Sequence, residues 1–360
     1  MTLTTVTAPA KQKNGFQRLI RNELARYILI RFLLIFPTIF ILVTMVFVLM
    51  RATGDPITAA QGGRLSPDQL QELISKAGYD RPILVQYWDY VTDVFRGDFG
   101  TTLSDNRDVL EMLTTYGPAT AELVFYSLIV AFAVGVPLGM VAAYYRDKRQ
   151  DAFLRVFAIL AYATPVFFSG LLMKLIFAVQ LDWLPVAGRA SLDTEIALST
   201  APVQTGIYTI DVIAAGDFAA LGDVLVHAIL PAVTLGLLTA GIFLRLVRTN
   251  VIGTLSAGYI ESGRSRGVSE YRLVRKHAYR PALIPIITVM GMQIALMLAG
   301  AVLTETTFEW KGLGFMLAQY LTARDFVAVQ GIVALLAVIV AVANFIVDII
   351  AALIDPRVRY

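Results

Sequence analysis

Long uncharged stretches alternate with charged ones along the chain. A helix that crosses the ~30 Å apolar core of a bilayer needs about 20 apolar residues, and six stretches meet that need. A helix that is apolar on every face is typical of a membrane rather than of a soluble core. The pattern therefore predicts an all-α polytopic membrane protein with six transmembrane helices, over residues 28–51, 119–145, 153–181, 224–248, 281–304 and 326–354.

The composition supports a membrane protein and narrows its chemistry. Of 360 residues, 57% are hydrophobic and only 16% are charged, whereas a soluble domain has about 25% charged residues. The chain has no cysteine, which excludes disulfides, thiol nucleophiles and metal sites with cysteine ligands. Its two histidines, His227 and His277, are too few for a His-rich metal site.

The sequence motifs of enzymes are missing or out of place. No G-x-x-x-x-G-K-[ST] phosphate loop occurs, so we do not expect the chain to hydrolyse ATP in that manner. Residues 263–267 fit the G-x-S-x-G pattern of hydrolases, but that pattern needs a strand-to-helix elbow. Here it lies in a basic segment between two predicted spans. We therefore expect no catalytic residue, metal site or cofactor site in this chain.

The distribution of charge predicts the orientation of the spans. One set of segments carries 20 Lys/Arg and 6 Asp/Glu, and comprises residues 1–31, 145–155, 245–280 and 355–360. A second set carries 8 Lys/Arg and 19 Asp/Glu, and comprises residues 52–118, 181–223 and 304–326. Because basic loops stay in the cytoplasm, the first set is predicted to be cytoplasmic. Both tails, residues 1–27 and 355–360, then lie in the cytoplasm.

The predicted external segments differ in character. Residues 52–118 contain a helix start at Ser66, a helix stop at Gly78 and a second, aromatic-rich helix with Tyr87, Trp88 and Tyr90 on one face. They predict a small folded α-helical cap, with a membrane-surface spacer as the alternative. The acidic segment 182–223 is either an insert near an external mouth or a flexible loop without a function. Residues 305–325 form the last external loop.

The predicted cytoplasmic loop over residues 249–280 is strongly basic. Small residues at positions 262, 263 and 265 allow a partner surface to approach closely. Gly267 is expected to end one short helix and Ser269 to cap the next. The loop is thus predicted to be a compact protrusion, or alternatively a basic loop that binds anionic lipid headgroups.

Polar residues inside the predicted spans are candidates for a transport pathway. Lys174, in the third span, either faces a polar pathway or extends towards the external surface. Thr288, Met292 and Gln293 in the fifth span share part of one helical face. They either line the pathway, with Met292 as a flexible gate, or pack against neighbouring helices.

The residues around position 261 resemble a known pattern. Glu261-Ser262-Gly263, three residues and then Gly267 are similar to the EAA loop of the membrane subunits of bacterial ABC importers. Ser262 and Gly263 replace the two alanines of that pattern but remain small. The continuation over residues 275–285 resembles the dipeptide/oligopeptide permease branch (DppB/OppB-type).

Other segments match the same branch in order, so that the resemblance spans roughly residues 28–358. They are Gly54-Asp55-Pro56, Asp80-Arg81-Pro82, residues 96–100, 184–189 and 227–232, Glu305-Thr306-Thr307-Phe308, Gly312-Leu313-Gly314, Arg324-Asp325 with Gln330-Gly331, and Asp355-Pro356-Arg357. Two departures stand out. Lys311 stands where the family usually has proline, and the insert over residues 190–223 is longer than in short members. Both lie in predicted external segments and bear on substrate identity.

The resemblance implies a permease subunit of an ATP-driven ABC importer in a bacterial inner, or plasma, membrane. The subunit would form half of the translocation pathway for di- and oligopeptides delivered by an external solute-binding protein. The implied partners are a second homologous permease subunit and two ATP-binding cassette subunits, which hold the ATP and Mg; no nucleic acid is involved. The ATPases are expected to dock on the cytoplasmic coupling loop at Tyr259, Glu261, Ser262, Gly263 and Gly267.

Other functions stay open from the sequence. The same importer architecture also suits nickel, glutathione or another small solute. A ligand-gated channel or receptor is a further alternative, in which residues 52–118 bind a ligand and residues 259–280 signal inward.

Overall fold

The computed structural model describes residues 23–52, 54–63 and 65–354. Within these residues the regular structure is helical, and the one β-type pairing is an isolated bridge between Thr101 and Asp108. The predicted all-α fold class is therefore confirmed. The predicted tail residues 1–22 and 355–360 lie outside the described part of the chain.

Five helices of the described chain are long and apolar enough to cross a membrane. They are α2 (Glu23–Ala52), α6 (Val109–Tyr144), α11 (Phe218–Leu255), α14 (Tyr279–Phe308) and α16 (Phe326–Ile354). Four of them start ahead of the predicted spans, and in α6 and α11 the reason is that an aspartate caps an earlier turn. The Asp108 side chain accepts a hydrogen bond from the Glu111 N–H, and the Asp217 side chain accepts from Ala219 and Ala220.

The predicted third span, residues 153–181, is a bent pair rather than one continuous helix. α7 (Arg149–Ala163) precedes α8 (Val166–Met173), which continues as the π-helix η1 (Lys174–Gln180). The two halves meet at an angle of 105°. The residue before a proline is disfavoured in the helical region, and Thr164 before Pro165 is indeed extended. With this pair counted as one span, the described chain has six.

Glycines allow α6 and α11 to pack closely. Gly135 and Gly139 lie one turn apart on α6. A Cβ at Gly135 would lie 2.7 Å from the Ala240 carbonyl oxygen, and one at Gly139 would lie 2.8 Å from the Leu244 carbonyl oxygen. Small residues at this spacing let helix backbones approach one another in a membrane. The α6–α11 contact is the most extensive helix pairing in the described chain.

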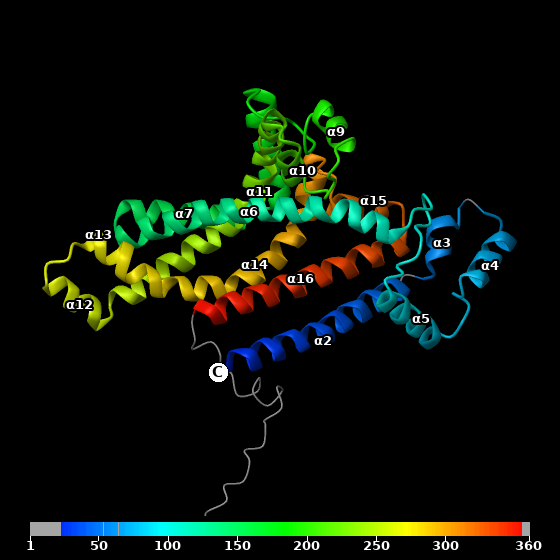
Figure 1. Ribbon diagram of the computed structural model, residues 1–360, viewed down its shortest axis with the longest axis horizontal. Helices are drawn as coiled ribbons and strands as arrows, with labels where there is room; N and C mark the ends of the chain where they lie inside the picture. Colours follow the sequence, from blue (N-terminus) through cyan, green and yellow to red (C-terminus); the bar gives the residue numbers. More distant parts are fainter. Residues whose placement is uncertain (1–22, 53, 64, 355–360) are drawn as a thin grey trace, which may run out of the picture.

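Helix α2 lies beside α16 at the edge of the bundle (Figure 1). The Arg31 Nε atom is 3.4 Å from the Asp348 Oδ2 atom, and the rings of Phe32 and Phe345 meet edge to face at 5.9 Å. Pairing with arginine lowers the cost of placing an aspartate in an apolar span. Elsewhere α2 exposes large apolar side chains such as Ile41, which suits contact with lipid.

Three short helices form the predicted cap: α3 (Pro56–Gln61), α4 (Pro67–Lys76) and α5 (Ile83–Arg96). Ser66 begins α4 with a capping box to Gln69. After α4 ends, Gly78 adopts φ = +73°, a conformation that glycine reaches without strain. The predicted helix start and stop therefore agree with the structure.

The aromatic residues of α5 divide between two environments. Tyr87 and Tyr90 pack on Phe47 of α2, with ring centroids 5.3 and 5.5 Å apart. Trp88 is 69% exposed. The three aromatic residues therefore do not share one face. Positions 87 and 90 are three residues apart and lie on the same side of the helix, whereas position 88 is only one or two residues from them and points elsewhere.

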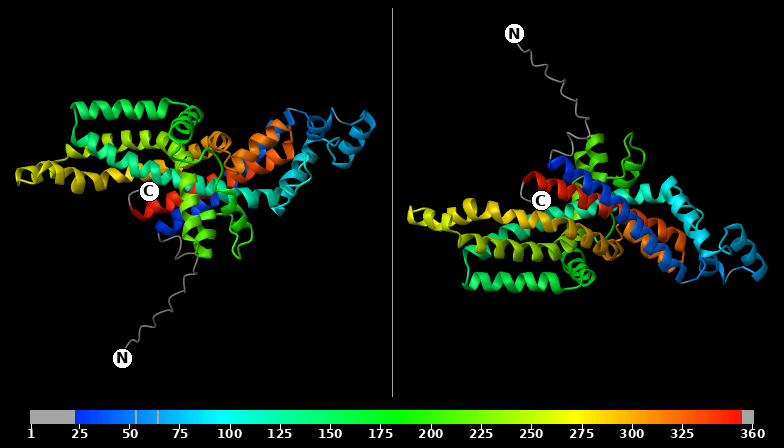
Figure 2. Two further views of the ribbon diagram at one scale, coloured as in Figure 1. Left: turned by 90° about the horizontal axis from the view of Figure 1, so that it is seen from above. Right: turned by 90° about the horizontal axis from the view of Figure 1, so that it is seen from below.

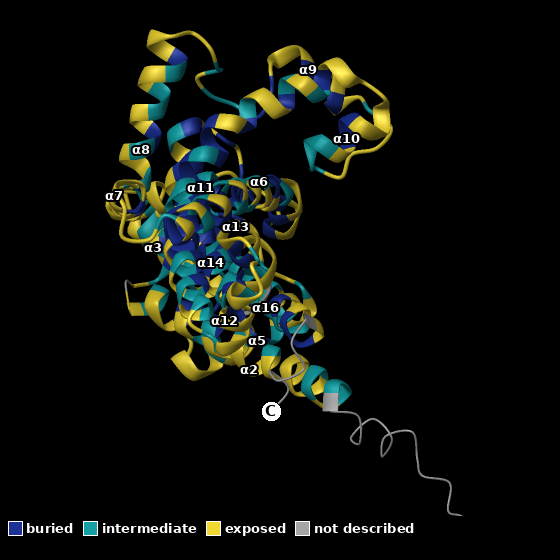
Figure 3. Cartoon of the chain, turned by 90° about the vertical axis from the view of Figure 1, so that its left-hand side faces the viewer, coloured by how far each residue is buried: buried dark blue, intermediate teal, exposed yellow. Residues whose placement is uncertain are grey.

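The remaining helices connect the spans. They are α9 (Leu192–Ser199), α10 (Tyr208–Ala215), α12 (Gly258–Ser265), α13 (Glu270–Arg272), the π-helix η2 (Leu273–Ala278) and α15 (Leu313–Thr322). The molecule is elongated, with α12 and α13 at one end and α3–α5 at the other (Figures 1 and 2). Buried residues gather along α11 and α14, whereas α8 and α9 project from the bundle and are largely exposed (Figure 3).

We expect the substitution Gly139→Leu to disrupt the α6–α11 contact, since its side chain would enter space held by the Leu244 carbonyl group and the Val247 side chain. Overpacking of this kind costs about 1–3 kcal/mol. The monodisperse fraction after extraction in mild detergent, measured by size-exclusion chromatography, should fall. The control is Gly253→Leu on α11, where a Cβ meets nothing within 4 Å. Equal yields of the two variants would contradict the close contact.

Candidate functional site

Helix α12 is exposed and has one buried anchor. Ile260 is fully buried, in a hydrophobic cluster that also contains Leu273 of η2. Its neighbours Tyr259, Glu261 and Ser262 are exposed. This pattern is typical of a surface helix that is attached on one side only. The three exposed residues, all predicted for docking, are therefore accessible to a partner.

The turn after α12 is a Schellman motif. The Val268 N–H donates to the Gly263 carbonyl at 3.1 Å, and the Gly267 N–H donates to the Arg264 carbonyl at 3.0 Å. Gly267 has φ = +77°, which glycine adopts without strain. Gly267 thus sets the direction in which the chain leaves α12.

An ion pair between Arg264 and Glu270 spans the same turn. The hydrogen bond from the guanidinium holds the pKa of Glu270 below its usual range. Both side chains are about half exposed, so solvent screens the pair and its contribution to stability is small. The pair mainly restricts the conformation of the loop.

Gly263 lies against η2 of the same chain and is only partly accessible to solvent. A Cβ at this position would lie 3.1 Å from the Leu273 Cδ2 atom. The missing side chain therefore lets α12 lie close to η2. Of the predicted docking residues, Gly263 and Gly267 shape the loop, and the exposed ones form its surface.

One hydrophobic cluster extends from α12 through the bundle. It contains Ile260 of α12, Phe243 of α11, Ala301 of α14 and Trp310, which directly follows α14. Trp310 is fully buried, and its indole N–H donates to the Ala119 carbonyl of α6 at 2.9 Å. Protein interiors are close-packed and transmit strain. A displacement of α12 would therefore strain the packing of this cluster.

Beside Trp310, the buried carboxyl group of Glu305 joins three segments. It accepts a hydrogen bond from the Thr120 hydroxyl of α6 at 2.7 Å and from the Phe315 N–H of α15 at 2.9 Å. A Cβ at Gly312 would lie 2.6 Å from each carboxyl oxygen. Glu305 and Gly312, which belong to two of the matched motifs, thus meet in one polar junction.

A buried ion pair attaches residues 182–223 to α6. The Arg189 Nη2 atom donates to the Glu122 Oε2 atom at 2.6 Å and to the Gly206 carbonyl at 2.9 Å. The guanidinium also lies 3.6 Å from the centroid of the Tyr208 ring. Breaking such a pair leaves a buried charge without compensation and costs about 3–5 kcal/mol. The segment therefore contains regular structure, α9 and α10, and is attached to α6.

The candidate pathway residues of α14 lie in different environments. Met292 is 62% exposed, whereas Gln293 is 3% exposed. The Gln293 Oε1 atom has no hydrogen-bond partner within the described chain. The side chain of Thr288 lies outside the described part of the chain. Of the three residues predicted to share one helical face, the structure therefore describes only the side chains of Met292 and Gln293.

Lys174 lies at the start of η1 and contacts the end of α14. Its Nζ atom donates to the Thr307 carbonyl at 3.1 Å. The last carbonyls of a helix lack partners within the helix and carry partial negative charge. In this structure Lys174 therefore stabilises the C-terminal turn of α14, a role that the sequence analysis did not consider.

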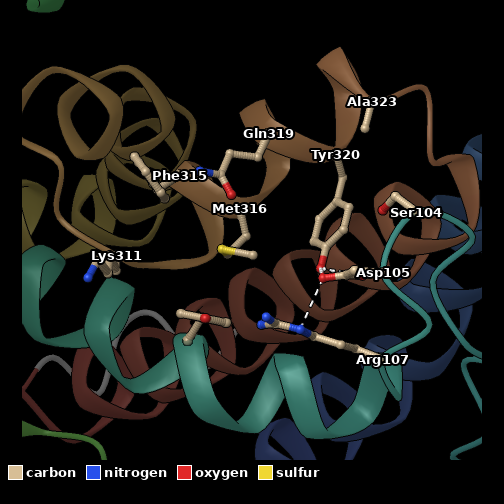
Figure 4. A pocket seen from close by; sticks show the side chains of 10 residues that line it. Ser104, Asp105, Arg107, Lys311, Phe315, Met316, Gln319, Tyr320 and Ala323 are labelled. Carbon is tan, nitrogen blue, oxygen red and sulfur yellow. Dashed lines mark hydrogen bonds and ion pairs between the residues drawn. The ribbon is translucent and has the colours of Figure 1, made fainter.

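A pocket of about 380 Å³ opens beside α15 at the N-terminal end of α6 (Figure 4). In it, the Asp105 carboxylate is already engaged: it accepts from Thr102 at 2.5 Å and from Tyr320 at 3.2 Å, and pairs with the Arg107 Nε atom at 3.0 Å. Burial raises the pKa of Tyr320 to about 12, so the phenol stays a donor at neutral pH.

Among the described residues, no group of three or more His, Asp or Glu side chains is placed to hold a metal ion. The candidate features that the structure offers are the α12 surface, the Glu305 junction and the Arg189–Glu122 pair. Sequence reasoning missed the pairing of Arg189 with Glu122. The available signal was that Arg189 is the one basic residue among residues 181–223, while Glu122 lies in an apolar stretch.

Comparison with known families agrees with this architecture. Residues 135–360 match the model of the binding-protein-dependent transport system inner membrane component. Residues 24–123 match the N-terminal model of membrane components of the same transport systems. Together the two models cover nearly the whole described chain.

Individual relatives are similar along their full lengths. The chain is 35% identical over 329 residues to the di/tripeptide transport system permease protein DppB of Pseudomonas aeruginosa, covering 91% of this chain and 96% of that protein. It is 35% identical over 338 residues to the dipeptide transport system permease protein DppB of Escherichia coli, covering 93% and 99%. The glutathione transport system permease protein GsiC of Salmonella typhimurium is 32% identical over 335 residues, again covering 93% and 99%.

A solved structure shares the fold. A chain of the MetNI methionine ABC transporter, in an inward-facing conformation, superposes with a TM-score of 0.50 at 16% identity, covering 68% of this chain and 97% of that chain. The helices, the family models and the relatives are in agreement. The chain is a multi-pass membrane protein and belongs to the family of inner membrane components of binding-protein-dependent transport systems.

Proposed function

We propose that the chain is one of two permease subunits of an ATP-driven importer and forms half of the pathway for di- and oligopeptides. The observation that carries the proposal is α12, an exposed helix that Ile260 anchors in the cluster ending at Trp310. Such a helix is suited to receive a displacement from a partner and pass it into the bundle. The chain lacks a phosphate loop, so two partner subunits would bind and hydrolyse ATP with Mg²⁺.

The substrate assignment rests on the relatives. Their names specify dipeptides, di- and tripeptides and, at 37% identity over 305 residues, D,D-dipeptides. A relative for glutathione, itself a modified tripeptide, makes glutathione the second candidate. An external solute-binding protein would deliver the peptide at the end of the molecule that carries α3–α5.

The first prediction concerns docking on α12. Ser262→Trp should weaken ATPase binding about fivefold or more, because a bulky side chain on an exposed contact residue prevents close approach. The measurement is the amount of ATPase that co-purifies with the permease, together with the ATP hydrolysis rate of the complex. Gln150→Trp is the control: it is exposed in α7, outside the loop. Docking on this helix would be ruled out if the Ser262 variant retained full ATPase binding and coupling.

The second prediction concerns orientation. We propose that α12 and both termini are cytoplasmic and that α4 is external, since basic loops stay inside. In this cysteine-free chain, Gln71→Cys on exposed α4 should react with a membrane-impermeant maleimide in intact spheroplasts. Ser262→Cys should react only after lysis. The reverse labelling pattern would invert the proposed topology.

The third prediction concerns the pathway. We propose that the exposed Met292 faces the pathway or its gate in the assembled importer. Met292→Ala should then change the basal ATPase rate or the range of transported peptides while leaving the yield of complex unchanged. Met297→Ala, a buried position on the same helix, should instead reduce the yield, because such truncations cost about 2–5 kcal/mol. Unchanged ATPase activity and uptake in the Met292 variant would remove it from the pathway.

A further inference from the structure

Two pockets at the proposed external end share a wall. The pocket of about 380 Å³ lies beside α15, and a second one of about 320 Å³ lies between α6 and the insert. Tyr116 and Lys311 line both. Each volume falls near the lower end of the range for small-molecule sites, about 300–1,000 Å³. The two pockets are therefore neighbours that meet at Tyr116 and Lys311.

The first pocket has an excess of positive charge. Asp105 is engaged by Thr102, Tyr320 and the Nε atom of Arg107. Figure 4 shows the other end of the Arg107 guanidinium pointing into the pocket beneath Met316. Lys311 adds a second cation on the shared wall. This pocket therefore suits a carboxylate.

The second pocket has an unpaired acid. Arg189 is committed to Glu122, and the Asp211 carboxylate accepts hydrogen bonds from Thr205 at 2.7 Å. Glu195 lines the same pocket and has no hydrogen-bond or ion-pair partner for its side chain among the described residues. This pocket therefore suits an ammonium group.

We propose that the joined pockets bind a short zwitterionic peptide, with its carboxylate at Arg107 and Lys311 and its ammonium group at Glu195. The inference rests on the proposed peptide importer and adds a binding site on the permease subunit itself. Peptide released by the delivery protein would be held here before it enters the bundle.

The walls of the site explain tolerance of varied side chains. Phe315 and Met316 of α15 and Tyr116 of α6 present apolar and aromatic surface between the charged ends. Methionine adapts to ligands of different shape. Selection by the two charged termini, with permissive contacts between them, suits a family of peptides rather than one compound. An inorganic anion would fit less well, because it would leave Glu195 without a counter-charge.

The test uses the assembled transporter in nanodiscs with the delivery protein omitted. The probe is L-alanyl-L-alanine, compared with its N-acetyl and C-terminal amide derivatives, and binding is measured by saturation-transfer NMR. The free dipeptide should bind at least about tenfold more tightly than either blocked form, the expected effect of losing one charged hydrogen bond.

Charge-neutral variants assign each terminus. Lys311→Gln should reduce the preference for the free carboxylate, because Arg107 remains as the second cation, and should leave the preference for the free ammonium group unchanged. Glu195→Gln should have the opposite effect. Asp193→Asn on the same helix and Arg96→Gln on α5 are exposed, lie outside both pockets, and should change neither preference.

The outcomes separate this inference from the proposed function. If the complete importer takes up alanylalanine but the permease binds it without charge preference, or the variants retain both preferences, the site is wrong and the importer stands. If the complete importer takes up no dipeptide, the proposed function itself fails. Swapped effects of the Lys311 and Glu195 variants would overturn the proposed direction of the peptide.

Discussion

The buried carboxyl group of Glu305 is the contact on which the junction of α6, α14 and α15 depends. It receives hydrogen bonds from Thr120 of α6 and from the first turn of α15, so that α6, α14 and α15 converge on one side chain. A buried polar group without partners costs about 1–3 kcal/mol, which makes this arrangement strongly specified. Gly312 has no side chain because the carboxyl oxygens occupy the space that a Cβ would need.

The same end of the bundle shares a hydrophobic cluster with α12. Trp310, five residues after Glu305, is the last member of a cluster that includes Ile260. Its indole N–H is bound to the Ala119 carbonyl, next to Thr120. A packed core cannot deform at one point alone. Displacement of α12 would therefore disturb the packing of the cluster that also contains Trp310.

The sequence predicts the fold well because the length of an apolar stretch and the residues that cap a helix are strong, local signals. It places the spans, the capped helix α4 and the turn at Gly267, each of which depends on nearby residues. It does not identify the pairing of Arg189 with Glu122, which are 67 positions apart. Nor does it reveal that Lys174 contacts the end of α14. Such contacts depend on how the spans are arranged, which no local pattern encodes.

Around Gly312, tightly constrained positions lie next to an exposed one. Gly314 is as constrained as Gly312, because a Cβ there would lie 2.6 Å from the Val302 Cα atom. Lys311, directly before them, is exposed and lines both pockets. A charge can therefore be added at position 311 without disturbing the Glu305 junction. The lysine at this position therefore adds a positive charge to both pockets and leaves the contacts of Glu305 intact.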